Sequence, residues 1–157
     1  MHALFRISVA ALLGLAAACS SARPPAVRLD AVTFAPELEV DLAASTRTSS
    51  GLYYRDLQVG TGLKAAEGSS VRVAYLGAFP TGEVFDLTKP GEKPLEFRIY
   101  RGPNRPIAGF EQGTVGMRVG GTRQVIIPPS LAYGARGTAT IPPNAVLVFT
   151  LQLMSVR

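Results

Sequence analysis

A glycine-rich loop near the end of the chain carries a tyrosine whose surroundings indicate a binding site. Tyr133 stands in the run 131–137, and the double proline 142–143 ties this loop to the apolar run 146–149. This pattern predicts an apolar pocket with a single hydroxyl in its rim. A buried tyrosine needs a hydrogen-bond partner in any case, so a purely structural role for the hydroxyl stays open.

The chain lacks the residues of the common nucleophilic and metal sites. Its one histidine is His2 and its one cysteine is Cys19. Both lie in or directly after a predicted export signal, so the mature chain has no Ser–His or Cys–His pair and no zinc site of cysteine and histidine. No GxxxxGK[ST] loop for nucleotides is present in the sequence. We therefore expect a function that needs no cofactor, no metal and no conventional nucleophile.

Two upstream segments make the pattern specific. Val84–Asp86 and Ile107–Glu111 precede the tyrosine loop, in this order and spacing. Together the three segments resemble the FKBP family of peptidyl-prolyl cis-trans isomerases, from about Leu52 to Arg157. The resemblance implies an α+β fold in which a strongly curved antiparallel β-sheet wraps around one short α-helix. It places the proline-binding site between the sheet and the helix.

The resemblance also implies a role for each site residue. Phe110 matches the pocket floor, where the best-studied members carry tryptophan, and a flat ring there stacks on proline and excludes water. Tyr133 matches the hydroxyl that donates to a substrate carbonyl, and the Ile107 N–H matches the donor to the carbonyl after proline. Asp86 matches the carboxylate at the pocket edge. The other matches are the second tyrosine and the pocket walls: Tyr75, Phe85, Ile141 and Phe149.

Each of these positions also has a plain structural interpretation. The apolar residues suit an ordinary core, and Asp86 by position alone suits a solvated turn. The sequence departs from the family pattern as well. Leu95 stands where a wall residue is often Phe, the loop 138–140 is one residue short, and 101–105 carries a small insertion. These loops frame the pocket mouth, so they bear on peptide preference and macrolide affinity. No large insert that would form a separate chaperone flap interrupts the region between Phe85 and Pro142.

Alternation of apolar and polar residues predicts the strands that must position the site. It is clearest at 53–59, 71–75, 95–99, 124–127 and 147–153, and a turn at 80–82 leads into 84–85.

One helix is predicted, from Ala108 to Met117. Apolar and small residues recur on one of its faces at Ile107, Phe110, Thr114 and Met117. Gly113 and Gly116 lower its intrinsic helix propensity, so packing against the sheet must hold it.

The N-terminus predicts export. Residues 1–18 form a signal peptide with a basic start and a short apolar run, and Cys19 follows three alanines. This resembles a bacterial lipobox, with Cys19 as the lipidation site and a membrane anchor through that lipid. Leu15 stands four residues before Cys19 rather than the commoner three, and 16–18 also satisfies an ordinary A-x-A cleavage site, which would release a soluble periplasmic protein. Ser20 in place of Asp favours the outer membrane.

The rest of the chain divides in two. Residues 19–50 are predicted to be the lipidated N-terminus and a tether, and 51–157 the folded isomerase domain. Within the tether, the apolar residues of 32–42 alternate with acids. This patch is a short strand, a fragment that packs on the domain, or a stretch that is only partly ordered.

Charge argues against nucleic acid as a partner. The net charge is +5, but the basic residues are scattered singly among acids and form no stripe. Proline-containing polypeptides are the expected substrates, with macrolide inhibitors as further ligands implied by the resemblance.

Three functions remain open at this stage. The first is a peptidyl-prolyl isomerase that assists folding of exported and envelope proteins, by fitting the twisted X–Pro amide better than either planar form. The second is a proline-peptide binding module without useful turnover. The third is an envelope protein whose domain is merely structural, which predicts no affinity for proline peptides.

Overall fold

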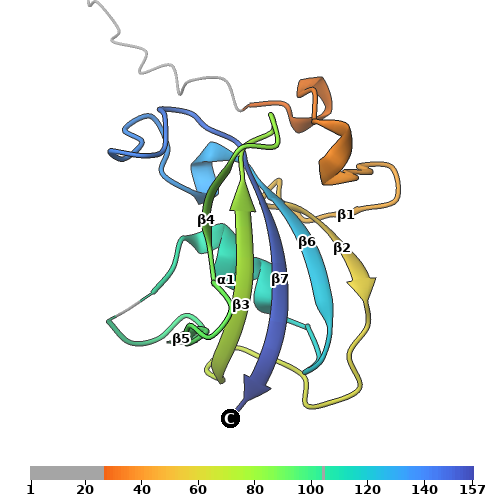
Figure 1. Ribbon diagram of the computed structural model, residues 1–157, viewed down its shortest axis with the longest axis vertical. Coiled ribbons are helices and arrows are strands. Elements are labelled where there is room, and N and C mark those ends of the chain that lie inside the picture. Colours follow the sequence, from red (N-terminus) through yellow and green to blue (C-terminus); the bar gives the residue numbers. More distant parts are fainter. Residues whose placement is uncertain (1–26, 104) are drawn as a thin grey trace, which may run out of the picture.

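A computed structural model describes residues 27–103 and 105–157 (Figure 1). The predicted signal peptide and Cys19 lie outside these residues. Within them, a seven-stranded antiparallel sheet has the order β1-β2-β6-β7-β3-β4, and β5 pairs with β3. The strands are β1 Thr46–Arg47, β2 Tyr53–Gln58, β3 Ser70–Ala78, β4 Val84–Leu87, β5 Leu95–Arg98, β6 Thr122–Ile127 and β7 Leu147–Val156.

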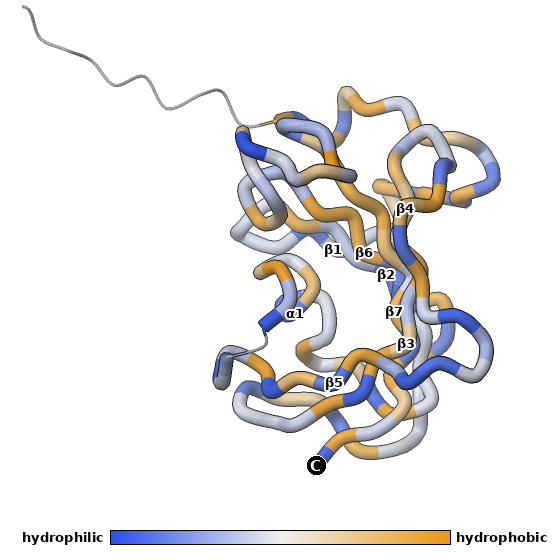
Figure 2. The backbone as a smooth tube through the Cα atoms, turned by 60° about the vertical axis from the view of Figure 1, so that its left-hand side comes forward, coloured by the Kyte–Doolittle hydropathy of each residue, from blue (hydrophilic) through white to orange (hydrophobic). Residues whose placement is uncertain are grey.

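The sheet curves around one α-helix, α1 at Ala108–Thr114, as Figures 1 and 2 show. Three short 3-10 helices accompany it in the described residues: η1 Leu29–Ala31, η2 Pro36–Leu38 and η3 Pro129–Leu131. The main core lies between α1 and the concave face of the sheet. This arrangement confirms the expected fold of a curved antiparallel sheet wrapped around a short helix.

Two glycines let α1 approach β6 closely. A Cβ at Gly109 would lie 2.3 Å from Ile127 Cγ2, and a Cβ at Gly113 would lie 2.8 Å from Val125 Cγ2. Side chains at these positions would therefore push the helix off the sheet. Gly113 lowers the intrinsic propensity of this segment to form a helix, so close packing against the sheet must stabilise the helix instead.

The helix ends at Thr114, three residues before the predicted end. Val115 turns to an extended conformation with ψ 133°, and Gly116 takes the left-handed φ of 82°. The buried guanidinium of Arg123 donates to the carbonyl oxygens of Gly113 and Val115 at 3.1 and 3.0 Å. These bonds satisfy carbonyls that the end of a helix leaves without partners.

β6 is buried on both of its faces. Val125 and Ile127 face α1, whereas Gln124 and Ile126 face the opposite side of the sheet, and all four are at most 3% exposed. An antiparallel sheet with only one covered face would leave Gln124 and Ile126 exposed to water. A further layer therefore covers the back of the sheet.

That layer is residues 29–42, here called the N-terminal segment. Leu29 forms a small second core with Ile126 and Val146, and half-buried apolar side chains of the segment pack against it: Val32, Phe34, Val40 and Leu42. Of the three alternatives that the sequence leaves open for 32–42, the structure shows the packed fragment, and these residues form no strand.

No helix in the described part of the chain is long and apolar enough to cross a membrane.

Candidate functional site

Four aromatic rings from different elements meet between α1 and the sheet. Phe110 of α1 lies edge-on to Phe149 of β7 and to Tyr75 of β3, with ring centroids 5.4 Å apart in both pairs. Phe85 of β4 lies edge-on to Phe149 at 5.6 Å. Edge-to-face contacts of this kind stabilise a cluster beyond its buried area. The structure thus brings together four of the residues predicted for the site.

Phe110 is the most deeply buried of these rings, at 2% exposed, and Phe149 is 5% exposed. Tyr75 and Phe85 are only half-buried. The cluster therefore has a buried floor, made of the first two rings, and a more exposed rim. Phe110, the predicted floor, is the most buried ring, whereas Phe149, predicted as a wall, is almost as deeply buried.

Asp86 belongs to the same cluster through a hydrogen bond. The Tyr75 hydroxyl donates to its carboxylate Oδ2 at 2.7 Å. Partial burial, then this hydrogen bond and the negative charge of Asp86, raise the pKa of Tyr75 to about 12. Tyr75 is therefore a neutral donor at physiological pH, and its hydroxyl orients the carboxylate. Asp86 lies in strand β4 rather than in a turn, and its side chain is exposed.

Ile107 presents a backbone donor at the start of α1. Its carbonyl accepts the N–H groups of Phe110 and Glu111 at 3.0 and 3.3 Å. Its own N–H makes no hydrogen bond to another described residue. The first N–H groups of a helix have no partner within the helix, so they are available to an outside carbonyl. The side chain of Ile107 packs against the main core.

The loop 131–144 folds back on itself. Thr138 N–H donates to the Ile141 carbonyl at 2.8 Å, and the Thr138 hydroxyl accepts the Ile141 N–H at 3.0 Å. Gly137, at φ 62°, allows this closure, because a Cβ there would overlap the backbone of Ile141 and Pro142. Ile141 is thereby buried, at 4% exposed.

Tyr133 stands apart from the ring cluster. It is 40% exposed, and its hydroxyl makes no hydrogen bond to any side chain or backbone group in residues 27–103 and 105–157. The structural alternative, a buried hydroxyl satisfied within the fold, is wrong for this residue.

Several supporting residues were not predicted from the sequence. Gly77 of β3 lies under two rings, and a Cβ there would come within 2.8 Å of both Phe149 and Phe85. A glycine inside an alternating strand signals such a close approach. Phe97 of β5 lies 5.8 Å from Phe110, and Phe79 lies 4.9 Å from Phe85. Leu95, the departure from the family pattern, packs against the same core.

Glu111 is the one fully buried carboxylate in the described chain. It accepts the Tyr100 N–H at 2.9 Å, and Arg105 Nη2 donates to it at 2.6 Å. Arg105 thus brings a cation to the helix that follows Ile107. A buried acid is tolerated only with such partners. The sequence signal that could have identified Glu111 is its position on the inner face of the predicted helix.

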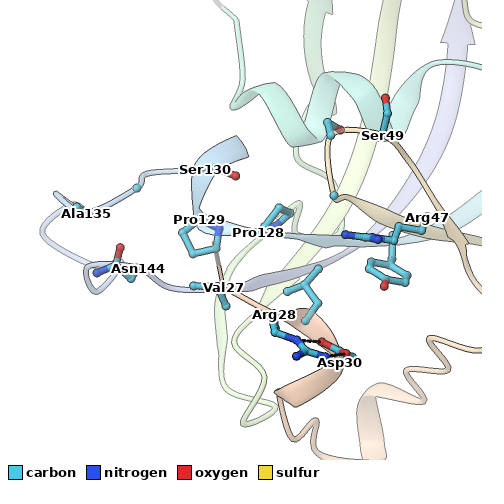
Figure 3. Close-up of a pocket in the computed structure, with 15 residues that line it drawn as sticks. Val27, Arg28, Asp30, Arg47, Ser49, Pro128, Pro129, Ser130, Ala135 and Asn144 are labelled. Carbon is cyan, nitrogen blue, oxygen red and sulfur yellow. Dashed lines mark hydrogen bonds and ion pairs between the residues drawn. The ribbon is translucent and has the colours of Figure 1, made fainter. Parts of the chain in front are cut away.

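A cavity among the described residues lies away from this cluster. A groove of about 790 Å³ runs between η1, the β1–β2 hairpin and η3, and Figure 3 shows its lining side chains. None of the predicted site residues lines it. No group of three or more Asp, Glu, His or Cys side chains in the described residues is placed to hold a metal ion.

Comparison with known proteins defines the family. The family model for FKBP-type peptidyl-prolyl cis-trans isomerase matches residues 62–154, more than half of the chain. The chain therefore belongs to the FKBP-type peptidyl-prolyl cis-trans isomerase family.

Solved structures agree with this assignment. FkpA from Escherichia coli has a TM-score of 0.65 and 34% identity, covering 73% of this chain and 52% of that one. AtFKBP13 has a TM-score of 0.65 and 36% identity, covering 72% of this chain and 98% of its own.

Curated relatives include longer fungal proteins. FK506-binding protein 3 of Candida albicans is 39% identical over 107 residues, which is 68% of this chain and 24% of that protein. FK506-binding protein 4 of Neurospora crassa is 38% identical over 114 residues, 73% of this chain and 24% of that protein. The chain thus spans about a quarter of the length of these relatives.

Proposed function

We propose that this protein catalyses the cis–trans isomerisation of X–Pro bonds. The observation that carries the proposal is the ring cluster with its buried Phe110 floor and the Asp86 carboxylate held by Tyr75. Two donors without partners among the described residues accompany it, the Ile107 N–H and the Tyr133 hydroxyl. Family membership supports the same activity.

The reaction needs no nucleophile. Rotation about a peptide bond crosses a barrier of ~18–20 kcal/mol, because resonance gives the C–N bond partial double-bond character. An apolar surface weakens the charge-separated resonance form that water stabilises. A site that binds the twisted amide more tightly than the planar forms lowers the barrier, and a 10⁴-fold acceleration corresponds to about 5.5 kcal/mol of such preference.

Each site residue has a part in this scheme. The proline ring packs on Phe110 between the walls formed by Phe85, Ile141 and Phe149. The Tyr133 hydroxyl and the Ile107 N–H bind the carbonyls on either side of the proline. Asp86, held by Tyr75, lies at the edge of the site, where its charge faces the twisting amide.

Tyr133→Phe tests the assigned donor with little risk to the fold, because this side chain is exposed. Tyr53→Phe, which removes a hydroxyl outside the ring cluster, is the matched control. We expect the first change to lower kcat/KM for a short apolar-X-Pro peptide about 2–10-fold, the effect of one hydrogen bond, and the second to leave it unchanged. Equal activity of both variants would remove Tyr133 from the mechanism.

The binding-module alternative has a distinct outcome in the same assay. Phe110 and Leu95 are smaller than the residues that the family often carries, which favours binding over turnover. Saturable binding of the peptide without acceleration would assign a docking module. Absence of both binding and acceleration would leave a structural domain.

Export and lipid anchoring complete the proposal. The sequence of 1–18 and the cysteine that follows support a lipoprotein of the bacterial envelope, held in the outer membrane and facing the periplasm, with exported proteins as clients. Metabolic labelling with a fatty acid in a bacterial host tests this directly. Label that is lost in Cys19→Ser supports the anchor, whereas an unlabelled soluble periplasmic product would show ordinary cleavage after Ala18.

Macrolides are proposed as competing ligands. The fungal relatives are named for FK506 binding, and the present chain shares their domain. FK506 should then displace a proline peptide from the wild-type protein, and Phe110→Leu should weaken that displacement. Retained peptide binding in saturating FK506 would show that the altered loops at the pocket mouth exclude the macrolide.

A further inference from the structure

The N-terminal segment contacts the turn that leads into β4. The Ala35 N–H donates to the Pro80 carbonyl at 2.8 Å. Glu37 lies against Gly82, where a Cβ would overlap its carboxylate. The turn itself is closed by the Gly82 N–H, which donates to the Phe79 carbonyl at 2.9 Å. The tip of this turn is therefore restrained from outside by residues 35–37.

The N-terminal segment is firmly attached to the back of the sheet. Gln124 Nε2, from a side chain only 3% exposed, donates to the Leu38 carbonyl at 2.6 Å. Arg55 Nη2 donates to the Glu39 carbonyl at 2.7 Å. Leu29 is buried at the other end of the segment. Because the N-terminal segment is attached to the sheet at several points, it can hold the β3–β4 turn in place.

β4 depends on such support, because the sheet alone holds it weakly. It pairs with β3 at three positions, with a register shift between Gly77 and Ala78, and the sheet order places it at an edge. Val84 and Leu87 are 45% and 37% exposed. Strands with one neighbour and little burial belong to the parts of a fold that open most readily. The turn before β4 is thus a main determinant of where this strand lies.

β4 carries two residues of the proposed site. Phe85 packs against Phe149, and Asp86 accepts the Tyr75 hydroxyl. We propose that residues 35–37, held on the back of the sheet, are positioning residues for the isomerase site: through the β3–β4 turn they fix Phe85 and Asp86 against the ring cluster. This inference rests on the proposed function and adds to it a part of the chain outside the matched family region.

Ala35→Pro in the full chain removes the N–H that donates to the Pro80 carbonyl. Ala35 has φ −62° and ψ 139°, which proline adopts, so the substitution deletes an N–H without straining its own backbone. Ala35→Ser, which keeps the N–H, is the matched control. Because one hydrogen bond changes an equilibrium about 2–10-fold, we expect kcat/KM to fall by that factor in Ala35→Pro and to stay unchanged in Ala35→Ser.

A second measurement separates positioning from general stability. The NMR signals of the Phe85 and Asp86 amides should shift in Ala35→Pro, and the pKa of Tyr75 should fall from its raised value as the bond to Asp86 loosens. These signals report on the site even if the protein proves inactive on peptides, so failure of the isomerase proposal and failure of this one are distinguishable. A lowered Tm with unchanged kcat/KM, amide signals and Tyr75 pKa would overturn the proposal and leave a purely structural segment.

Discussion

Tyr75 of β3 and Asp86 of β4 are joined by a hydrogen bond of 2.7 Å from the phenol to the carboxylate, across two adjacent antiparallel strands. This bond connects the ring cluster to the edge strand. It fixes the direction of the only carboxylate among the predicted site residues. The position of the negative charge at the rim of the site is therefore fixed by the pairing of β3 with β4.

Asp86→Asn should lower the pKa of Tyr75. Partial burial, the hydrogen bond and the negative charge of Asp86 all raise this pKa to about 12. The substitution removes the charge and leaves the burial, so the pKa should fall but stay above its ordinary value of 10. Titration of the tyrosine Cζ signals by NMR measures this. An unchanged pKa would show that burial alone causes the shift.

The same pKa fixes the pH range in which this bond stabilises the fold. The pKa of Tyr75 is higher in the folded than in the unfolded chain, so the folded state holds its proton more tightly. The stabilisation is fully present below about pH 10, the ordinary pKa of tyrosine. It is lost as the pH rises from there through the folded pKa of about 12. The wild type should therefore lose more stability between these pH values than Tyr75→Phe, as measured by denaturant unfolding.

Gly77→Ala should destabilise the protein by overpacking. The new Cβ would meet both Phe149 and Phe85 at 2.8 Å. Overpacking a close-packed core costs about 1–3 kcal/mol. Denaturant unfolding measures this cost. Adding Phe85→Leu to Gly77→Ala should restore part of the lost stability, because the Phe85 ring that the new Cβ overlaps is then absent. A double variant as unstable as the sum of its single changes would show that the rings do not converge on Gly77.

Arg105→Met should cost more stability than Arg72→Met. The two arginines are almost equally exposed, at 45% and 44%, but Glu111 is fully buried whereas Glu96 is 57% exposed. Losing Arg105 leaves a buried carboxylate short of partners, at a cost of about 1–3 kcal/mol. Losing Arg72 breaks an exposed pair, which contributes about 0–1 kcal/mol. Equal costs in denaturant unfolding would contradict the role of Glu111 as an anchor for the insertion.

Leu29→Ala tests whether the N-terminal segment is part of the folded unit. Leu29 is 4% exposed, whereas nearby Val27 is 39% exposed. Removing a buried leucine side chain costs about 2–5 kcal/mol. Val27→Ala should change the free energy of unfolding by about 0.5 kcal/mol or less. If both substitutions were neutral, residues 29–42 would not be packed on the sheet in solution.

The sequence predicts the strands well, because alternation is a local signal. The runs around Val73, Val125 and Leu151 each fall within observed strands. The helix end was less predictable. Apolar spacing continues to Met117, yet Gly116 takes a left-handed conformation that a helix cannot contain. Spacing alone does not report this, because glycine is also tolerated inside a helix at modest cost.

Site residues could be predicted from the sequence where the residue type itself indicates the role, as it does for an aromatic ring or a carboxylate. The rings of Phe110 and Phe149 lie in contact, and Asp86 accepts the Tyr75 hydroxyl, whereas Gly77 and Glu111 act through contacts between elements distant in the sequence. The N-terminal segment was the most ambiguous part. Its apolar residues alternate with acids, and only the small core around Ile126 and Val146 on the back of the sheet decides that they pack rather than remain solvated.

The most direct test of the account is the cis-to-trans rate of a short apolar-X-Pro peptide in the presence of the full chain, with Phe110→Leu as the site variant. Leu153→Ala, which removes buried volume outside the ring cluster, controls for general destabilisation. The account predicts acceleration by the wild type and by Leu153→Ala, and its loss or strong reduction in Phe110→Leu. No acceleration by the folded wild type, or equal acceleration by all three proteins, would contradict it.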